Sequence, residues 1–180
     1  MTFKTPTVIL LSIALSACGQ SKDSKMKMDI DEILKMNDET SALMHIDTEL
    51  NSLSNYGEEL NRLTEPQKIF LFVENLEREV NNGGFHQFFF NSSGDYAHET
   101  VKALETIGAF KTAKIVDESI TPWPDKKVPT DREVRQELLE EIEKIGNPVW
   151  EKCDTQFFKY DDKIGTLLLE FVKKNKPAFK

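Results

Sequence analysis

Histidine and its acidic neighbours are the first candidates for catalytic or metal-binding chemistry in this chain. His86 and His98 lie twelve residues apart, and Glu79 and Glu99 lie near them in the sequence. Helical metal sites usually place two ligands three or four residues apart, and no His-x-x-x-His or Glu-x-x-His pair occurs here. We therefore interpret both histidines as polar residues beside turns, and we expect no metal and no cofactor.

Cys18 is the residue whose surroundings indicate a covalent modification. It ends the segment LSAC (15–18), which follows an apolar stretch from Val8 and a positive charge at Lys4. The stretch is shorter than the about 20 apolar residues of a membrane span, and it is typical of a secretory signal peptide. The last four residues resemble the lipobox of bacterial lipoproteins. This resemblance implies a lipid on the Cys18 sulfur and cleavage before it, whereas the alternative is an ordinary signal peptide with a chance cysteine.

The chain is expected to have three parts: a signal peptide (1–17), a lipidated N-terminus with a flexible tether (18–27), and one domain (28–180). The tether GQSKDSKMK is polar and has no apolar periodicity. Gly19 is not the aspartate that retains lipoproteins in the inner membrane of enteric-type bacteria. By that analogy a Gram-negative cell would send the protein to its outer membrane. We predict a location in the cell envelope, with the lipid as the membrane anchor.

No nucleophile is accompanied by the partners that catalysis requires. The chain lacks the Gly-x-Ser-x-Gly turn that exposes the serine of many hydrolases. Cys153 has no intramolecular partner if Cys18 is acylated, and a lone thiol of this kind is usually buried and inert. Acidic residues are too numerous for a catalytic pair to stand out. We therefore expect a protein without enzymatic activity.

The charge of the chain is strongly acidic. It carries 23 basic and 31 acidic side chains, one lysine lies in the signal peptide, and the mature charge is therefore −9. Such a surface disfavours direct binding to nucleic acid or anionic lipid, because each needs Lys and Arg to meet phosphate. Spacings of three and four predict a negative stripe on one helix, made of Glu133, Glu137, Glu140 and Glu141. This stripe is either a solvated face or a docking surface for a basic partner.

Helical spacing dominates the domain and strand alternation is nearly absent, which predicts an all-α fold of about seven or eight helices. The clearest helix begins after Thr64, where Gln67 completes a capping box. Asn and Gly tolerate the left-handed conformation, so the segment 81–84 is expected to end this helix. The segment 85–91 then forms a short aromatic stretch.

A second capping box is expected at 130–133. Its helix would carry the apolar residues Val134, Leu138, Ile142 and Ile145, the first three opposite the negative stripe, and would end at Gly146-Asn147-Pro148. Asp161 or Asp162 is expected to open the last helix.

Two apolar features have alternative interpretations. The phenylalanines of the segment 85–90 form the protein core or line an apolar ligand pocket. Trp123, held between two prolines, is a loop plug over the core or an exposed contact residue. The glycines at 83–84 follow a helix and not a strand, so we interpret them as a chain reversal and not as a phosphate loop.

Four stretches carry a resemblance to a known family: LTEPQKI (63–69), EVNNGGFHQFF (79–89), NSSG (91–94) and ALETIGA (103–109). Together they resemble the bacterial family named for a DNA-mimic protein, most closely over 63–120. The resemblance implies an all-α fold, and the name-giving member is acidic, dimeric and occupies the DNA-binding face of a transcription factor. The matching positions are interpreted as helix caps and core: Asn82, Gly83, Gly84, Phe85, Gln87, Phe88, Gly94 and Gly108.

Three hypotheses about function follow. The first is a lipid-anchored envelope module without enzymatic activity that binds a basic protein partner through the acidic stripe, with a homodimer left open. The second is cytoplasmic DNA mimicry, if translation begins at Met26 or Met28. The third is an envelope enzyme or small-ligand binder that uses the segment 85–90 with His86.

Overall fold

The computed structural model describes residues 28–180, so Cys18, the signal peptide and the tether lie outside the described residues. In this part the chain forms seven α-helices and four short 3-10 helices and has no strand, which confirms the all-α prediction. None of these helices is long and apolar enough to span a membrane. The α-helices are α1 (Ile30–Ile33), α2 (Glu39–Leu53), α3 (Glu65–Phe90), α4 (Ala97–Ile107), α5 (Phe110–Ser119), α6 (Arg132–Phe157) and α7 (Ile164–Lys174), and the 3-10 helices are η1 (Leu60–Arg62), η2 (Ser92–Tyr96), η3 (Pro124–Lys126) and η4 (Lys176–Phe179).

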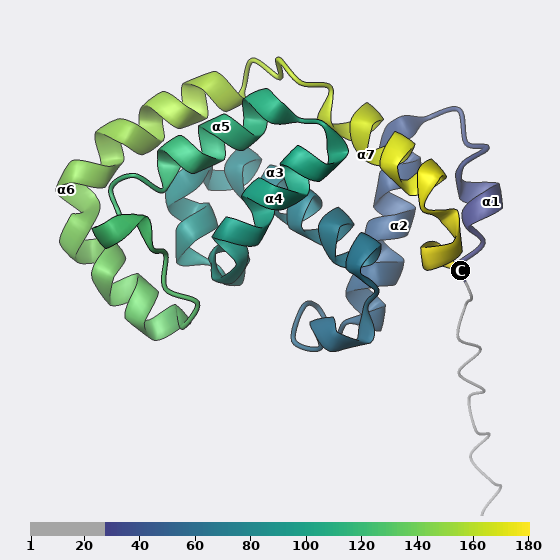
Figure 1. The fold of residues 1–180 in the computed structure, drawn as a ribbon, viewed down its shortest axis with the longest axis horizontal. Helices are drawn as coiled ribbons and strands as arrows, with labels where there is room; N and C mark the ends of the chain where they lie inside the picture. Colours follow the sequence, from purple (N-terminus) through teal and green to yellow (C-terminus); the bar gives the residue numbers. More distant parts are fainter. Residues whose placement is uncertain (1–27) are drawn as a thin grey trace, which may run out of the picture.

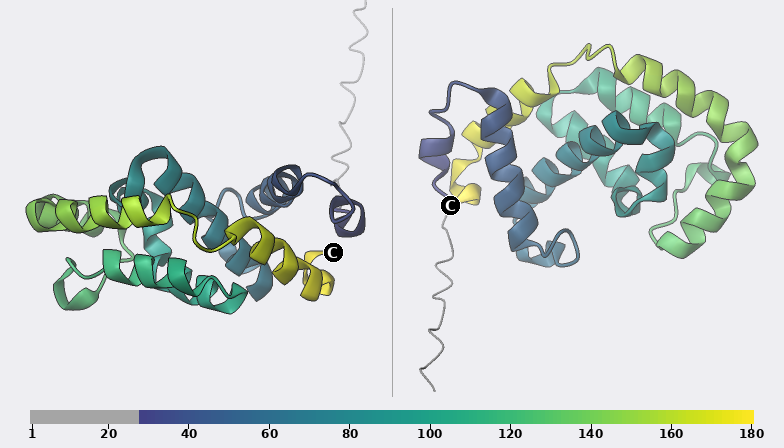
Figure 2. Two further views of the ribbon diagram at one scale, coloured as in Figure 1. Left: turned by 90° about the horizontal axis from the view of Figure 1, so that it is seen from above. Right: turned by 180° about the vertical axis from the view of Figure 1, so that it is seen from behind.

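Helix α3 runs through the middle of the molecule and contacts α2, α4, α6 and α7. Figure 1 shows α6 at one end of the long axis, and α1, α2 and the C-terminus at the other end. The two further views in Figure 2 keep this order of elements. The described chain therefore begins and ends at the same end of the molecule, far from the first turns of α6.

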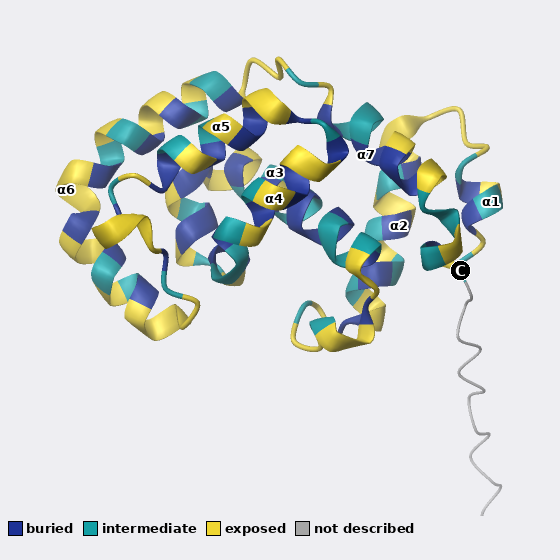
Figure 3. Ribbon diagram, viewed as in Figure 1, coloured by how far each residue is buried: buried dark blue, intermediate teal, exposed yellow. Residues whose placement is uncertain are grey.

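The core follows α3 along its length. Phe70, Val73, Leu76 and Val80 are fully buried, and so are Phe85, Phe88 and Phe89 beyond the glycines. Figure 3 shows the buried residues on the sides of the helices that face one another. Each fully buried phenylalanine contributes about 1.5–3 kcal/mol to folding, so α3 contributes much of the hydrophobic stabilisation.

The predicted start of α3 is confirmed, but its predicted end is wrong. The Gln67 N–H donates to Thr64 Oγ1 (3.4 Å) and the Thr64 N–H donates to Gln67 Oε1 (2.9 Å), which completes the capping box. The chain leaves helical geometry at Gly83 and Gly84, and the helix then resumes through Phe90. The aromatic stretch is therefore the second half of a kinked helix.

A carboxylate from α6 stabilises the restart of α3. Asp154 Oδ1 accepts a hydrogen bond from the Phe85 N–H (2.8 Å), one of the amides that a helix start leaves without an internal partner. Gly84 has φ +71° and ψ −172°, a conformation that is essentially restricted to glycine. A Cβ at Gly84 would lie 2.4 Å from Asp154 Oδ2. The kink thus depends on glycine for both its backbone conformation and its cap.

Helix α6 departs from the prediction at both ends. Its N-cap is Asp131, whose carboxylate accepts from the Val134 N–H (3.1 Å), so a capping box at Thr130 is wrong. The helix continues through Pro148, because Trp150, Cys153 and Phe157 recur at helical spacing and all three are buried.

The buried face of α6 is also rotated from the predicted one. It carries Arg135, Leu139, Ile142 and Gly146, whereas Val134 is 52% exposed and Ile145 is 61% exposed. The prediction was wrong because it considered only apolar residues, whereas the buried side of α6 includes the side chain of Arg135.

The start of α7 is a further correction. Its N-cap is Lys163, which makes no side-chain capping bond. Asp162 instead accepts from the Thr112 N–H of α5 (2.8 Å), so this carboxylate caps α5 and not α7.

The Gly84→Ala substitution is expected to lower the free energy of unfolding by about 2–4 kcal/mol, because it adds backbone strain and displaces the Asp154 cap. Gly57→Ala is the matched control, since Gly57 also has positive φ (+92°) but a Cβ there would meet nothing within 4 Å. Urea denaturation of both variants measures the difference. Equal losses of stability would show that the Asp154 contact is unimportant.

Candidate interaction surface

The four glutamates of the predicted negative stripe lie on α6 and are exposed: Glu133, Glu137, Glu140 and Glu141. None of them takes part in an ion pair among the residues that the structure describes. Their carboxylates are therefore available to an external partner without breaking an internal salt bridge.

The buried side chain of Arg135 fixes the position of this part of α6. Its Nε donates to the Phe89 carbonyl (2.7 Å), and its Nη2 donates to the Asn91 carbonyl (2.9 Å). Its Nη1 donates to the Pro129 carbonyl (2.8 Å), and the guanidinium also pairs with Asp95. The group thus satisfies carbonyls at the end of α3, where a helix leaves them without partners.

Sequence reasoning missed Arg135, although a signal was present. Arg135, Leu139 and Ile142 recur at spacings of four and three, which is the spacing of a buried helical face. An arginine within such a face indicates a buried ion pair or hydrogen bonds to backbone carbonyls, because burying an unpaired charge costs too much free energy.

The family motif surrounds the α3 kink and shapes it. The Glu79 carboxylate accepts from Gln87 Nε2 (2.7 Å), Asn91 Nδ2 (2.8 Å) and Ser93 Oγ (3.2 Å), and so joins the two halves of α3. Gly94 lies against Arg135, where a Cβ would come within 2.8 Å of Nε. The contacts of these residues are internal.

The remaining motif residues are found at turns or in the core. Phe85 and Phe88 are fully buried, Asn82 and Gly83 are exposed at the kink, and Gly108 ends α4 with φ +88°.

Gly83 and Gly84 form a kink within α3, whereas the predicted feature was a chain reversal at the end of the helix. The Phe85 amide that would face a phosphate already donates to Asp154, and the carboxylate fills the position. A second anion there would meet a negative charge.

The aromatic residues pack against one another. Phe89 contacts both Trp123 (ring centroids 5.3 Å apart) and Trp150 (5.7 Å). Trp123 is buried, as expected of a loop residue that covers the core, and His86 is exposed with its ring in a T-shaped arrangement with Trp150. Most of the segment 85–90 is therefore core, and its exposed side chains are His86 and Phe90.

The candidate groups for catalysis and metal binding are separated from one another. Cys153 is buried, and burial raises the pKa of its thiol to about 12, so that the reactive thiolate is scarce at neutral pH. His98 accepts from the Val128 N–H (3.3 Å) as a structural contact. Among residues 28–180, no three His, Cys, Asp or Glu side chains are grouped as a metal site.

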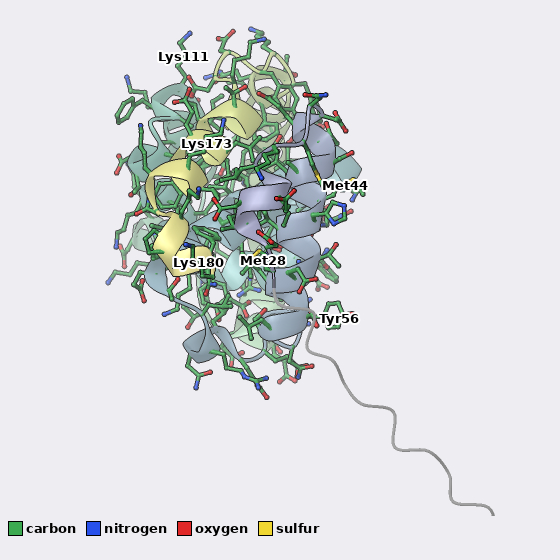
Figure 4. The ribbon with its side chains drawn as sticks, turned by 90° about the vertical axis from the view of Figure 1, so that its right-hand side faces the viewer. Met28, Met44, Tyr56, Lys111, Lys173 and Lys180 are labelled. Carbon is green, nitrogen blue, oxygen red and sulfur yellow. The ribbon has the colours of Figure 1, made fainter. Side chains whose placement is uncertain are left out.

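A groove of about 450 Å³ between α2, α3 and α7 was not predicted. Glu74, Glu77 and Arg78 line it from α3, and Met44, labelled in Figure 4, lines it from α2. Sequence reasoning missed it because two acids three residues apart do not stand out in so acidic a chain. The lining contains no histidine, cysteine or serine, and its carboxylates, amides and Arg78 suit a polar group.

Glu74 is the unusual group of this groove. Its Oε1 is buried and has no hydrogen-bond partner among the described residues. Burial, with the nearby carboxylates of Glu77 and Asp47, raises the pKa of Glu74 to about 8, against a smaller opposing effect of Arg78. Glu74 therefore holds a proton at neutral pH.

These features define an all-α protein in which a glycine motif shapes a kinked central helix and an acidic helix lies exposed at one end. The model of the DMP19-like protein family matches residues 61–175, and the chain belongs to this family. This confirms the resemblance found in the sequence. No curated protein and no solved structure matched the chain.

Replacing Arg135 by alanine is expected to destabilise the fold by about 3–5 kcal/mol, because Asp95 and the carbonyls of Phe89 and Asn91 lose a buried partner. Arg132→Ala is the control, since Arg132 is exposed on the same helix. Urea denaturation followed by circular dichroism measures both. A loss below about 1 kcal/mol for Arg135→Ala would contradict the proposed anchoring role.

The Glu74→Gln substitution is expected to stabilise the protein at pH 8 and above and to leave it nearly unchanged near pH 4. The unfolded chain releases the Glu74 proton near its ordinary pKa of 4.5, whereas the folded chain keeps it to about pH 8. The folded state binds more protons between these values, so this group makes stability fall as the pH rises through them. Thermal melts across this range, with the exposed control Glu143→Gln, measure the effect. A pH profile that Glu74→Gln does not change would refute the assignment.

Proposed function

We propose that the protein is a protein-interaction module without enzymatic activity, anchored in the cell envelope by a lipid on Cys18, and that it binds its partner through α6. The LSAC segment supports the anchor, and the mature charge of −9 supports a basic partner. The observation that carries the proposal is the row of exposed α6 glutamates, free of ion pairs in the described chain.

The arrangement of the helices suits such an anchor. Met28, at which the tether would join the domain, lies with Lys173 and Lys180 on the end of the molecule seen in Figure 4. The first turns of α6 lie at the opposite end of the long axis (Figure 1). A nine-residue tether would reach about 15–18 Å, which would keep the end of the molecule that carries Met28 close to the membrane. The glutamates of α6 would then point away from anionic headgroups and towards other envelope proteins.

Family membership favours a second candidate function. The match to the DMP19-like family supports an acidic DNA mimic that occupies the DNA-binding face of a transcription regulator. Such mimicry needs carboxylates that replace phosphates, and it needs a DNA-binding protein in the same compartment. An unlipidated product that begins at Met26 or Met28 would meet the second requirement.

Intact mass measurement and membrane fractionation of the natively expressed protein distinguish these two functions. A membrane-bound species that begins at an acylated Cys18 is the expected result. A soluble species without lipid in the cytoplasm would overturn the anchor and favour DNA mimicry.

Charge reversal of the four α6 glutamates to lysine is expected to reduce crosslinking to the native envelope partner on the order of tenfold, because exposed charges steer and orient association. The matched control reverses four exposed acids on other helices: Glu99, Glu105, Asp117 and Glu170. Both variants change the net charge equally. Equal losses in the two would show that net charge, and not the α6 surface, governs binding.

A further inference from the structure

Helix α6 exposes apolar side chains beside its glutamates. Val134 is 52% exposed and Ile145 is 61% exposed. Val134, Leu138, Glu141 and Ile145 recur at spacings of four, three and four, so they share one helical face. Leu138 is partly buried against the core, which leaves the other three as the outer part of this face.

Folding does not account for the two exposed apolar residues. Valine and isoleucine are β-branched and are weaker helix formers than alanine, leucine or glutamate. Exposed on α6, they contribute neither good helix propensity nor full burial, whereas Leu139 and Ile142 already pack the inner face. Single exposed apolar residues are common, but two on one face beside unpaired carboxylates form a mixed surface. Such a surface suits a partner that covers the apolar groups.

The charges around this face decide which partner fits. Glu137, Glu140, Glu141 and Glu143 are exposed between Val134 and Ile145, with Lys144 as the exposed base in that interval. A second copy of this face would bring like charges together, and lipid or nucleic acid phosphates would be repelled. A protein segment that carries both apolar side chains and Lys or Arg satisfies both parts of the surface.

We propose that this α6 face, made of Val134, Glu137, Leu138, Glu141 and Ile145, docks a basic amphipathic segment of a partner protein. Apolar side chains of the segment cover Val134 and Ile145, and its lysines or arginines pair with Glu137 and Glu141. The proposal rests on the proposed function in one respect, that the ligand of α6 is a protein.

Salt dependence separates this docking mode from phosphate mimicry. A surface that only imitates phosphate binds by charge, so its affinity falls steeply as salt rises. Burial of Val134 and Ile145 adds a contribution that salt does not screen. The two modes therefore predict different affinities at high ionic strength.

The test uses the full chain with Cys18→Ser, which removes the acylation site, and a synthetic 21-residue peptide of leucine and lysine in amphipathic helical order. A peptide of the same composition in scrambled order is the control ligand. Fluorescence anisotropy is expected to show about tenfold tighter binding of the amphipathic peptide. Equal affinities for the two peptides would overturn the proposal.

Two double variants divide the surface into its parts. The Val134→Ser, Ile145→Ser variant is expected to bind the amphipathic peptide about tenfold more weakly. Its affinity for the scrambled peptide is expected to stay the same. The Glu137→Lys, Glu141→Lys variant is expected to have a lower affinity for both peptides. The control variant Met44→Ser, Phe110→Ser removes exposed apolar groups on α2 and α5. It is expected to leave the affinity for both peptides unchanged. An unchanged affinity in the first variant would overturn the proposal.

Crosslinking of the native partner in the envelope separates this proposal from the proposed function. If the Val134 and Ile145 variant and the charge-reversed variant both lose the partner, the docking mode is supported. If only charge reversal loses it, α6 still binds a partner but the amphipathic mode is wrong. If both variants still crosslink to the partner, the docking mode and the proposed function of α6 are both wrong.

Discussion

The buried guanidinium of Arg135 is the interaction on which the rest of the structure depends. A buried charge is tolerated only when it is paired and hydrogen-bonded, and here Asp95 and the carbonyls of Phe89, Asn91 and Pro129 supply the partners. Those carbonyls belong to the end of α3 and to the loop before α6. One side chain therefore holds the last turn of the central helix, the η2 turn and the start of α6 in one arrangement.

The same constraint determines which residues α6 presents to solvent. Because Arg135 points inward, Leu139 and Ile142 follow it into the core, and the rotation carries Val134 and Ile145 outward. The four glutamates are exposed in this rotation, and Glu141 shares a helical face with Val134 and Ile145. A mixed apolar and acidic outer face is thus a direct consequence of burying an arginine.

Local signals in the sequence predicted much of the fold, and interactions between distant segments explain the rest. The all-α class and the capping box at Thr64 depend on neighbouring residues and were predictable. The restart of α3 depends on Asp154, which lies 69 residues away from Phe85, and no local pattern indicates it. The continuation through Pro148 depends likewise on the packing of Trp150, whose indole N–H donates to the Ser119 carbonyl (2.9 Å). Of the candidate surface, the glutamates were predictable and the rotation of the helix was not.

The residues that first indicated the DMP19-like family lie mainly in and around the kink of α3 and not in α6. Glu79 and Gly94, which the motif places around the kink, contact α3 and Arg135. In this chain the motif residues determine how the central helix bends, and none of them belongs to α6. Function is determined by the groups at a site and not by the fold that carries them. For this chain we propose that those groups are the carboxylates of α6 and the apolar side chains that lie beside them on its outer face.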